Sequence, residues 1–165
     1  MRVFYGLIIT AVILMIGACA LKAYKKEGAL ARVVFLYELG AFICGIIFLV
    51  YTYVPGTTIT VLCKGLIMAS FDWLLILLMY YTQYYTGMFK GIVGVKVFMI
   101  AYSLLETVAF LINTWTRWIF DITYISDDQI IVQFAKGNVL GRLHYVFAYG
   151  IMLLLILCYI VMVER

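Results

Sequence analysis

The chain has 165 residues, of which 67% are hydrophobic and 12% are charged, and its formal net charge is +4. A water-soluble domain of this size needs far more polar surface, so the composition excludes a soluble globular protein. The basic residues are scattered between apolar segments instead of forming a stripe, which argues against nucleic-acid binding. Their placement instead indicates on which side of a membrane each loop lies.

The apolar runs are long and continuous rather than alternating, which favours membrane-spanning helices over a β-barrel. A helix that crosses the bilayer needs about 20 apolar residues. Segments of that length cover residues 3–24, 29–53, 59–86, 91–113 and 139–163. We therefore predict an all-α polytopic membrane bundle of about five helices, with residues 1–165 forming a single domain.

The connections between the predicted helices differ in length and in chemistry. The first three are short and contain Gly or Pro, which is typical of tight turns. The fourth, residues 114–138, is long and has two β-rich runs around a polar turn at Asp127 and Asp128. This pattern predicts a small β-hairpin over residues 120–134.

Basic residues near the ends of the segments predict the orientation, because cytoplasmic loops carry an excess of Lys and Arg. One side has Lys22, Lys25, Lys26, Arg32, Lys90, Lys96 and Arg165, and the other has Arg2, Arg117, Lys136 and Arg142. We predict a multi-pass cell-membrane protein with its N-terminus outside, its C-terminus in the cytoplasm and its hairpin extracytoplasmic. The alternative, a cleaved signal peptide in residues 1–20, is disfavoured because only Arg2 precedes the apolar run.

Ionisable side chains inside a membrane span cost several kcal/mol and usually mark a function or a tightly paired group. At a rise of about 1.5 Å per residue, Lys64, Glu106 and His144 lie about 8–10 Å below the outer boundary, in one layer. Asn113 opens this layer to the outside, and Arg142 lies slightly shallower. The layer is either an outward-facing pocket for a ligand or signal, or an ionic network that only fixes helix packing.

Glu38 and Asp72 lie deeper by the same estimate, about 10–15 Å from the cytoplasmic boundary, and we predict that they form a second, acidic layer. The chain has a single histidine and no close pair of cysteines, so we expect no metal site. It also has no phosphate-binding glycine loop and no serine elbow. We therefore expect no enzymatic activity and no cofactor.

Three motifs carry a resemblance to a known family. Residues 81–87, Tyr-Thr-Gln-Tyr-Tyr-Thr-Gly, end the third segment, Lys64 lies near its start, and His144 and Tyr149 open the fifth with a His-x-x-x-x-Tyr pattern. In their order and spacing these motifs resemble the N-terminal seven-helix sensor region of bacterial histidine kinases, which also occurs in diguanylate cyclases. The resemblance covers the first five helices of that region and stops before its last two.

The resemblance implies a membrane sensory input module that detects an extracytoplasmic or membrane-borne signal. Its expected partners are membrane lipid, an unknown small ligand or signal, and a cytoplasmic kinase or cyclase output domain that is absent from this chain. A homodimer is a further possibility. The family's Asn-Pro-x-His-His junction is replaced here after Asn113 by Thr114, Thr116 and Arg117. This departure removes any ligand role that those histidines would carry.

Two other classes fit the same size and composition. A small membrane transporter subunit, such as a substrate-binding component, predicts a substrate-sized pocket and a motif that docks an ATPase, and we find no such motif in the sequence. A membrane scaffold protein predicts helices without a polar layer. The missing docking motif argues against the transporter subunit, and the polar residues inside the segments argue against the scaffold.

Overall fold

The structure is a computed structural model and describes residues 2–88, 90–91, 93–126 and 129–163. The predicted polar turn at Asp127 and Asp128 lies outside the described residues, as do Phe89 and Arg165. Within the described residues the elements follow in the order α1 (Arg2–Tyr24), α2 (Ala29–Tyr53), α3 (Thr57–Thr86), α4 (Val93–Thr116), β1 (Phe120–Ser126), β2 (Gln129–Phe134) and α5 (Val139–Val163).

The described elements confirm the predicted all-α membrane bundle with one small hairpin between its fourth and fifth helices. All five described helices are long and apolar enough to cross a bilayer. The largest difference in bounds is at the end of α4, which continues to residue 116 instead of 113. It ends there because Arg117 takes a left-handed backbone conformation with φ 53°, and its N–H donates to the carbonyl oxygen of Asn113 at 2.9 Å.

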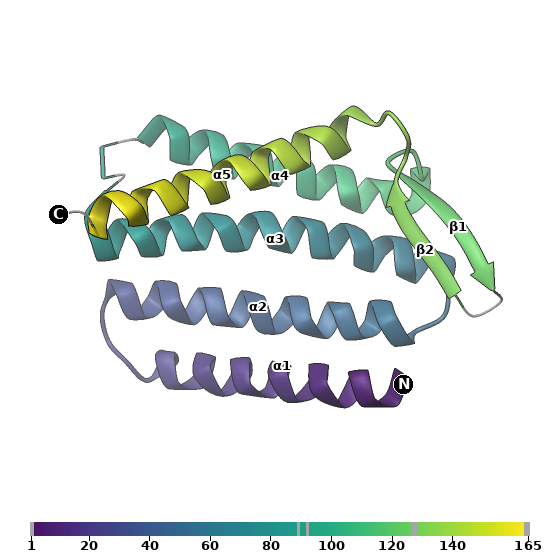
Figure 1. The fold of residues 1–165 in the computed structure, drawn as a ribbon, viewed down its shortest axis with the longest axis horizontal. Helices are drawn as coiled ribbons and strands as arrows, with labels where there is room; N and C mark the ends of the chain where they lie inside the picture. Colours follow the sequence, from purple (N-terminus) through teal and green to yellow (C-terminus); the bar gives the residue numbers. More distant parts are fainter. Residues whose placement is uncertain (1, 89, 92, 127–128, 164–165) are drawn as a thin grey trace.

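The helices form a row of three with two further helices against its end (Figure 1). α1 packs against α2, and α2 packs against α3. α3 is the central helix, because its other side contacts both α4 and α5. The N-terminus and the hairpin lie at one end of the bundle, and the C-terminus lies at the opposite end (Figure 1).

Buried apolar side chains form two groups along α3. One group includes Leu75 and Met79 of α3 with Met99 of α4 and Ile151 of α5. The other lies nearer the hairpin and joins Val61 and Phe110 to residues of the hairpin and its approach, namely Ile119, Phe120 and Val132. The segment of α3 between the two groups contains Asp72, a buried acid.

The hairpin lies on the end of the bundle. β1 and β2 are antiparallel, with Phe120 opposite Phe134 and Ile122 opposite Val132. The ring of Phe110 in α4 packs against both phenylalanines, with centroids 5.7 Å from Phe120 and 6.2 Å from Phe134. The alternation that predicted the strands therefore also directs one face of the hairpin onto the helices.

Candidate functional site

Three ionisable side chains from three helices meet between the two apolar groups. Asp72 comes from α3, Glu106 from α4 and His144 from α5. The tight turn between α3 and α4 sets the level of the two acids, since Asp72 lies 15 residues before Gly87 and Glu106 lies 15 residues after Gly91. Antiparallel helices joined by a short turn place such equidistant residues side by side.

The three side chains are in close contact and almost completely buried. Nδ1 of His144 lies 3.2 Å from Oε2 of Glu106 and 3.4 Å from Oδ2 of Asp72. The exposed fractions of Asp72, Glu106 and His144 are 0%, 1% and 2%. One ligand atom from each residue lies within 4.8 Å of the others. We call these three residues the acid–histidine cluster.

Neighbouring hydrogen bonds hold the cluster in place. The hydroxyl of Tyr102, one helical turn before Glu106, donates to Oε1 of Glu106 at 3.2 Å. The indole N–H of Trp73 donates to Oγ1 of Thr107 at 3.1 Å, which ties α3 to α4 at the same level. Because Tyr102 bonds to Oε1, the other carboxylate oxygen of Glu106, Oε2, is the one that faces His144.

Aromatic rings separate the cluster from the hairpin end. The imidazole of His144 lies 5.8 Å from the ring of Phe110 and 5.9 Å from that of Phe134, measured between centroids. Phe134 belongs to β2, so the hairpin contacts the cluster directly. Because the three side chains are at most 2% exposed, electrostatic interactions among them are stronger than they would be in water.

The cluster differs from the layers that the sequence indicated. Glu106 and His144 meet, as the depth estimate suggested. Asp72 lies with them and not in a deeper layer with Glu38; in the described part of the chain no ion pair or hydrogen bond joins Asp72 to Glu38. The estimate failed for Asp72 because its depth was counted from the cytoplasmic end of its helix, whereas the depths of Glu106 and His144 were counted from the outer ends. These counts are not comparable, since α3 has 30 residues and α4 has 24.

Lys64 and Arg142 lie apart from the cluster. Lys64 is half-buried and stands eight residues before Asp72 on α3, which is about 12 Å along the helix axis. No ion pair joins it to Glu106 or His144 within the described chain. Arg142 is exposed. The cluster therefore contains two acids and no lysine or arginine, contrary to our expectation that Lys64 would lie in one layer with Glu106 and His144.

Asn113 has a structural contact at the end of α4. It is 0% exposed, and its Oδ1 accepts a hydrogen bond from the backbone N–H of Ile119 at 2.7 Å. This bond fixes the course of the chain between α4 and β1. Asn113 lies seven residues, about two helical turns, beyond Glu106 on α4, and the contact of its amide oxygen is with the backbone and not with the cluster.

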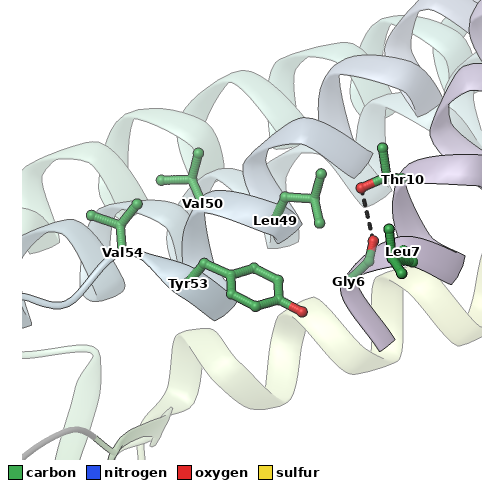
Figure 2. A pocket seen from close by; sticks show the side chains of 7 residues that line it. All are labelled: Gly6, Leu7, Thr10, Leu49, Val50, Tyr53 and Val54. Atoms are coloured by element: carbon green, nitrogen blue, oxygen red, sulfur yellow. Dashed lines mark hydrogen bonds between the residues drawn. The ribbon is translucent and has the colours of Figure 1, made fainter. Parts of the chain in front are cut away.

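Cavities elsewhere in the bundle are mainly apolar. One of about 480 Å³ lies between the start of α1 and the end of α2, where the ring of Tyr53 lies beside Gly6 (Figure 2). Thr10 donates its hydroxyl hydrogen to the carbonyl oxygen of Gly6 at 2.7 Å and so has its partner within α1 (Figure 2). A second cavity, of about 220 Å³, lies between α3 and α5 and reaches His144.

Two contributors to the site were missed at the level of sequence. Tyr102 precedes Glu106 by four residues, a spacing that places two side chains on one helix face, so its role could have been inferred. Phe134 could not, because its contact with His144 depends on how the hairpin docks.

No protein-family model, curated protein or solved structure matches this chain. The resemblance to sensor regions therefore rests on the sequence motifs. Within the described structure, chemistry-bearing side chains from three helices come together in the acid–histidine cluster.

Proposed function

We propose that the chain is a membrane sensory input module and that the acid–histidine cluster receives its signal. The observation that carries the proposal is the burial of Asp72, Glu106 and His144 in contact with one another between apolar groups. Ionisable residues at such positions are costly, and they generally mark a ligand site, a proton site or a switch.

The position of the cluster suits a switch because it joins α5 to the other helices. His144 is the residue through which α5 contacts the two acids of α3 and α4. Binding of a ligand or a proton changes the attraction across this contact and favours a different placement of α5. Near the opposite end of the bundle α5 contacts α3 again, where the hydroxyl groups of Thr82 and Tyr159 share a hydrogen bond with their oxygens 3.3 Å apart.

The proposed signal is extracytoplasmic or membrane-borne, and the proposed output is a cytoplasmic kinase or cyclase domain. The basic flanks favour a cytoplasmic C-terminus, so α5 would lead toward that domain. The cavity between α3 and α5 reaches His144 and supports access from the membrane side. A ligand shifts such an equilibrium only by its difference in affinity for the two states.

The coding sequence that follows Arg165 is the first test. We expect two further apolar helices and then a histidine kinase or diguanylate cyclase domain, or a neighbouring gene that encodes such a domain. A neighbouring gene for a transport ATPase, together with uptake of a small solute that depends on this chain, would contradict the proposal and favour the transporter subunit.

Substitution of Glu106 in the complete receptor is the second test. Glu106→Gln preserves the shape of the side chain and an acceptor for Tyr102 but removes the charge next to His144. We expect normal membrane abundance and a loss of the signal-dependent change in kinase or cyclase output. Glu38→Gln, which alters a half-buried acid outside the cluster, is the matched control. Equal responses in both variants and the wild type would contradict the proposal.

A further inference from the structure

The acid–histidine cluster has more hydrogen-bond acceptors than donors. Asp72 is 0% exposed, and neither of its carboxylate oxygens accepts a hydrogen bond in the described part of the chain. Nδ1 of His144 can carry one hydrogen, which faces oxygens at 3.2 Å and 3.4 Å. Both distances exceed the length of about 2.7–2.9 Å that is usual for charge-assisted N–H···O bonds. One hydrogen therefore does not satisfy the two acids.

The two distances from Nδ1 of His144 to the carboxylates match those between ligands of a metal ion. Ligand atoms about 2.1 Å from a metal are about 3.0 Å apart in an octahedral site and about 3.4 Å apart in a tetrahedral site. The separations of Nδ1 from the two carboxylate oxygens, 3.2 Å and 3.4 Å, lie close to these values. The three ligand atoms come from three different helices and lie within 4.8 Å of one another.

We propose that Asp72, Glu106 and His144 bind one divalent transition-metal cation. The two carboxylates balance the charge of such an ion while the imidazole stays neutral, so the loaded cluster has no net charge inside the bundle. The buried carboxylate of Asp72, whose oxygens accept no hydrogen bond, gains a bond to the metal. A proton on Nδ1 leaves when the metal–nitrogen bond forms, because a ligating histidine must be deprotonated at that atom.

The donor set selects the class of metal. Imidazole nitrogen suits Zn²⁺, Fe²⁺, Ni²⁺ and Cu²⁺, whereas Ca²⁺ takes six to eight oxygens and Mg²⁺ prefers an octahedron of oxygens and water. One nitrogen with two carboxylates therefore favours a metal such as Zn²⁺ or Fe²⁺ over Mg²⁺ and Ca²⁺. The Tyr102 hydroxyl donates to Oε1 of Glu106 and so orients Oε2 toward the site, as outer-shell partners of metal ligands commonly do.

The sequence led us to expect no metal site because the chain has one histidine and no ligand-spaced cysteine pair. Folding supplies the other ligands from helices that are distant in sequence. The idea that this cation is the signal of the sensor rests on the proposed function. Cation binding itself is independent of any output, so the two can fail separately.

Calorimetric titration of Zn²⁺ into the purified chain in lipid nanodiscs, after removal of metals with a chelator, tests the inference. We expect one Zn²⁺ per chain, with proton release detected from the difference between two buffers of unequal ionisation enthalpy. Asp72→Asn, Glu106→Gln and His144→Gln should each weaken binding at least tenfold. The control variants Glu38→Gln and Asp121→Asn, which change acids outside the cluster, should bind like the wild type.

Tyr102→Phe keeps all three ligands and covers the case in which the ligand variants do not fold. Loss of an outer-shell hydrogen bond usually weakens metal affinity about 10–100-fold, and we expect a loss in that range with normal circular dichroism. Absence of Zn²⁺ binding by the wild type would overturn the inference and leave a cluster that holds only protons. Unchanged binding by Tyr102→Phe and by every folded ligand variant would overturn it equally.

The same variants in the complete receptor separate this inference from the proposed function. Zn²⁺ binding that is lost in the variants while kinase or cyclase output stays normal would support the metal site and contradict the sensory role of the cluster. Loss of output in variants of a chain that binds no Zn²⁺ would support the sensory role and contradict the metal site.

Discussion

Removal of the imidazole should expose how strongly the acid–histidine cluster holds the helices together. In His144→Leu the two carboxylates of Asp72 and Glu106 stay buried without a positive partner. With the imidazole protonated, its contacts at 3.2 Å and 3.4 Å are each worth about 5 kcal/mol of Coulomb attraction at an effective dielectric constant of about 20. The cost of desolvating the charges offsets a large part of this attraction.

Removal of one partner of a buried ion pair usually lowers the free energy of unfolding by about 3–5 kcal/mol. We expect His144→Leu to have an effect of this size. Addition of Asp72→Asn should recover most of the loss, because it removes one carboxylate and supplies an amide donor for Glu106. The two substitutions are therefore expected to be strongly non-additive, as contacting residues in one network are.

The assay is reversible unfolding in mixed micelles of a mild detergent and dodecyl sulfate, followed by circular dichroism with a chelator present. The thiols of Cys63 and Cys158 are buried, so their rate of reaction with a thiol reagent gives a second measure. Arg142→Gln, at an exposed position, should change stability by about 0.5 kcal/mol or less. A similarly small effect of His144→Leu, or an additional loss with Asp72→Asn, would refute the electrostatic argument.

Two further predictions concern helix packing and topology. A Cβ at Gly65 would lie 3.2 Å from the carbonyl oxygen of Phe110, so Gly65→Ala should separate α3 from α4 and cost about 1–3 kcal/mol. Gly150→Ala meets open space and should be neutral or stabilising in the same unfolding assay; equal effects would disprove the close approach. Asp121→Cys should react with a membrane-impermeant thiol reagent added to intact cells, whereas Lys26→Cys should not, and the reverse result would overturn the predicted orientation.

Much of the fold could be predicted because a bilayer leaves few solutions for a chain of this composition. Long apolar runs must form helices when their backbone groups have no water to bond with, and Gly and Pro mark where the runs break. The hairpin was also predictable, since the alternation over residues 120–134 has a period that helices do not share. α3 begins at residue 57 instead of 59, and α4 covers residues 93–116 instead of 91–113, because local turn geometry decides where a helix begins and ends.

The composition of the site was only partly predictable. Depth counted from helix ends brought Glu106 and His144 together but assigned Asp72 to the wrong layer. The sequence allowed a better rule. Residues that are equally far from the short turn between α3 and α4, one on each helix, lie at the same depth. That rule pairs Asp72 with Glu106 and places Lys64 level with Thr114, outside the cluster. The tilt of α5 and the docking of the hairpin depend on long-range packing and had no comparable signal.

The arrangement of the helices assigns different tasks to the two parts of the bundle. α1 and α2 expose apolar side chains along most of their length and bury few of them within the chain. In a bilayer such faces are solvated by lipid tails, so they cost little and need no specific partner. α3, α4 and α5 instead enclose charged groups, which lipid cannot solvate. Substitutions that alter function should therefore concentrate in α3, α4 and α5, and a systematic scan of α1 should affect membrane insertion more than any signal response.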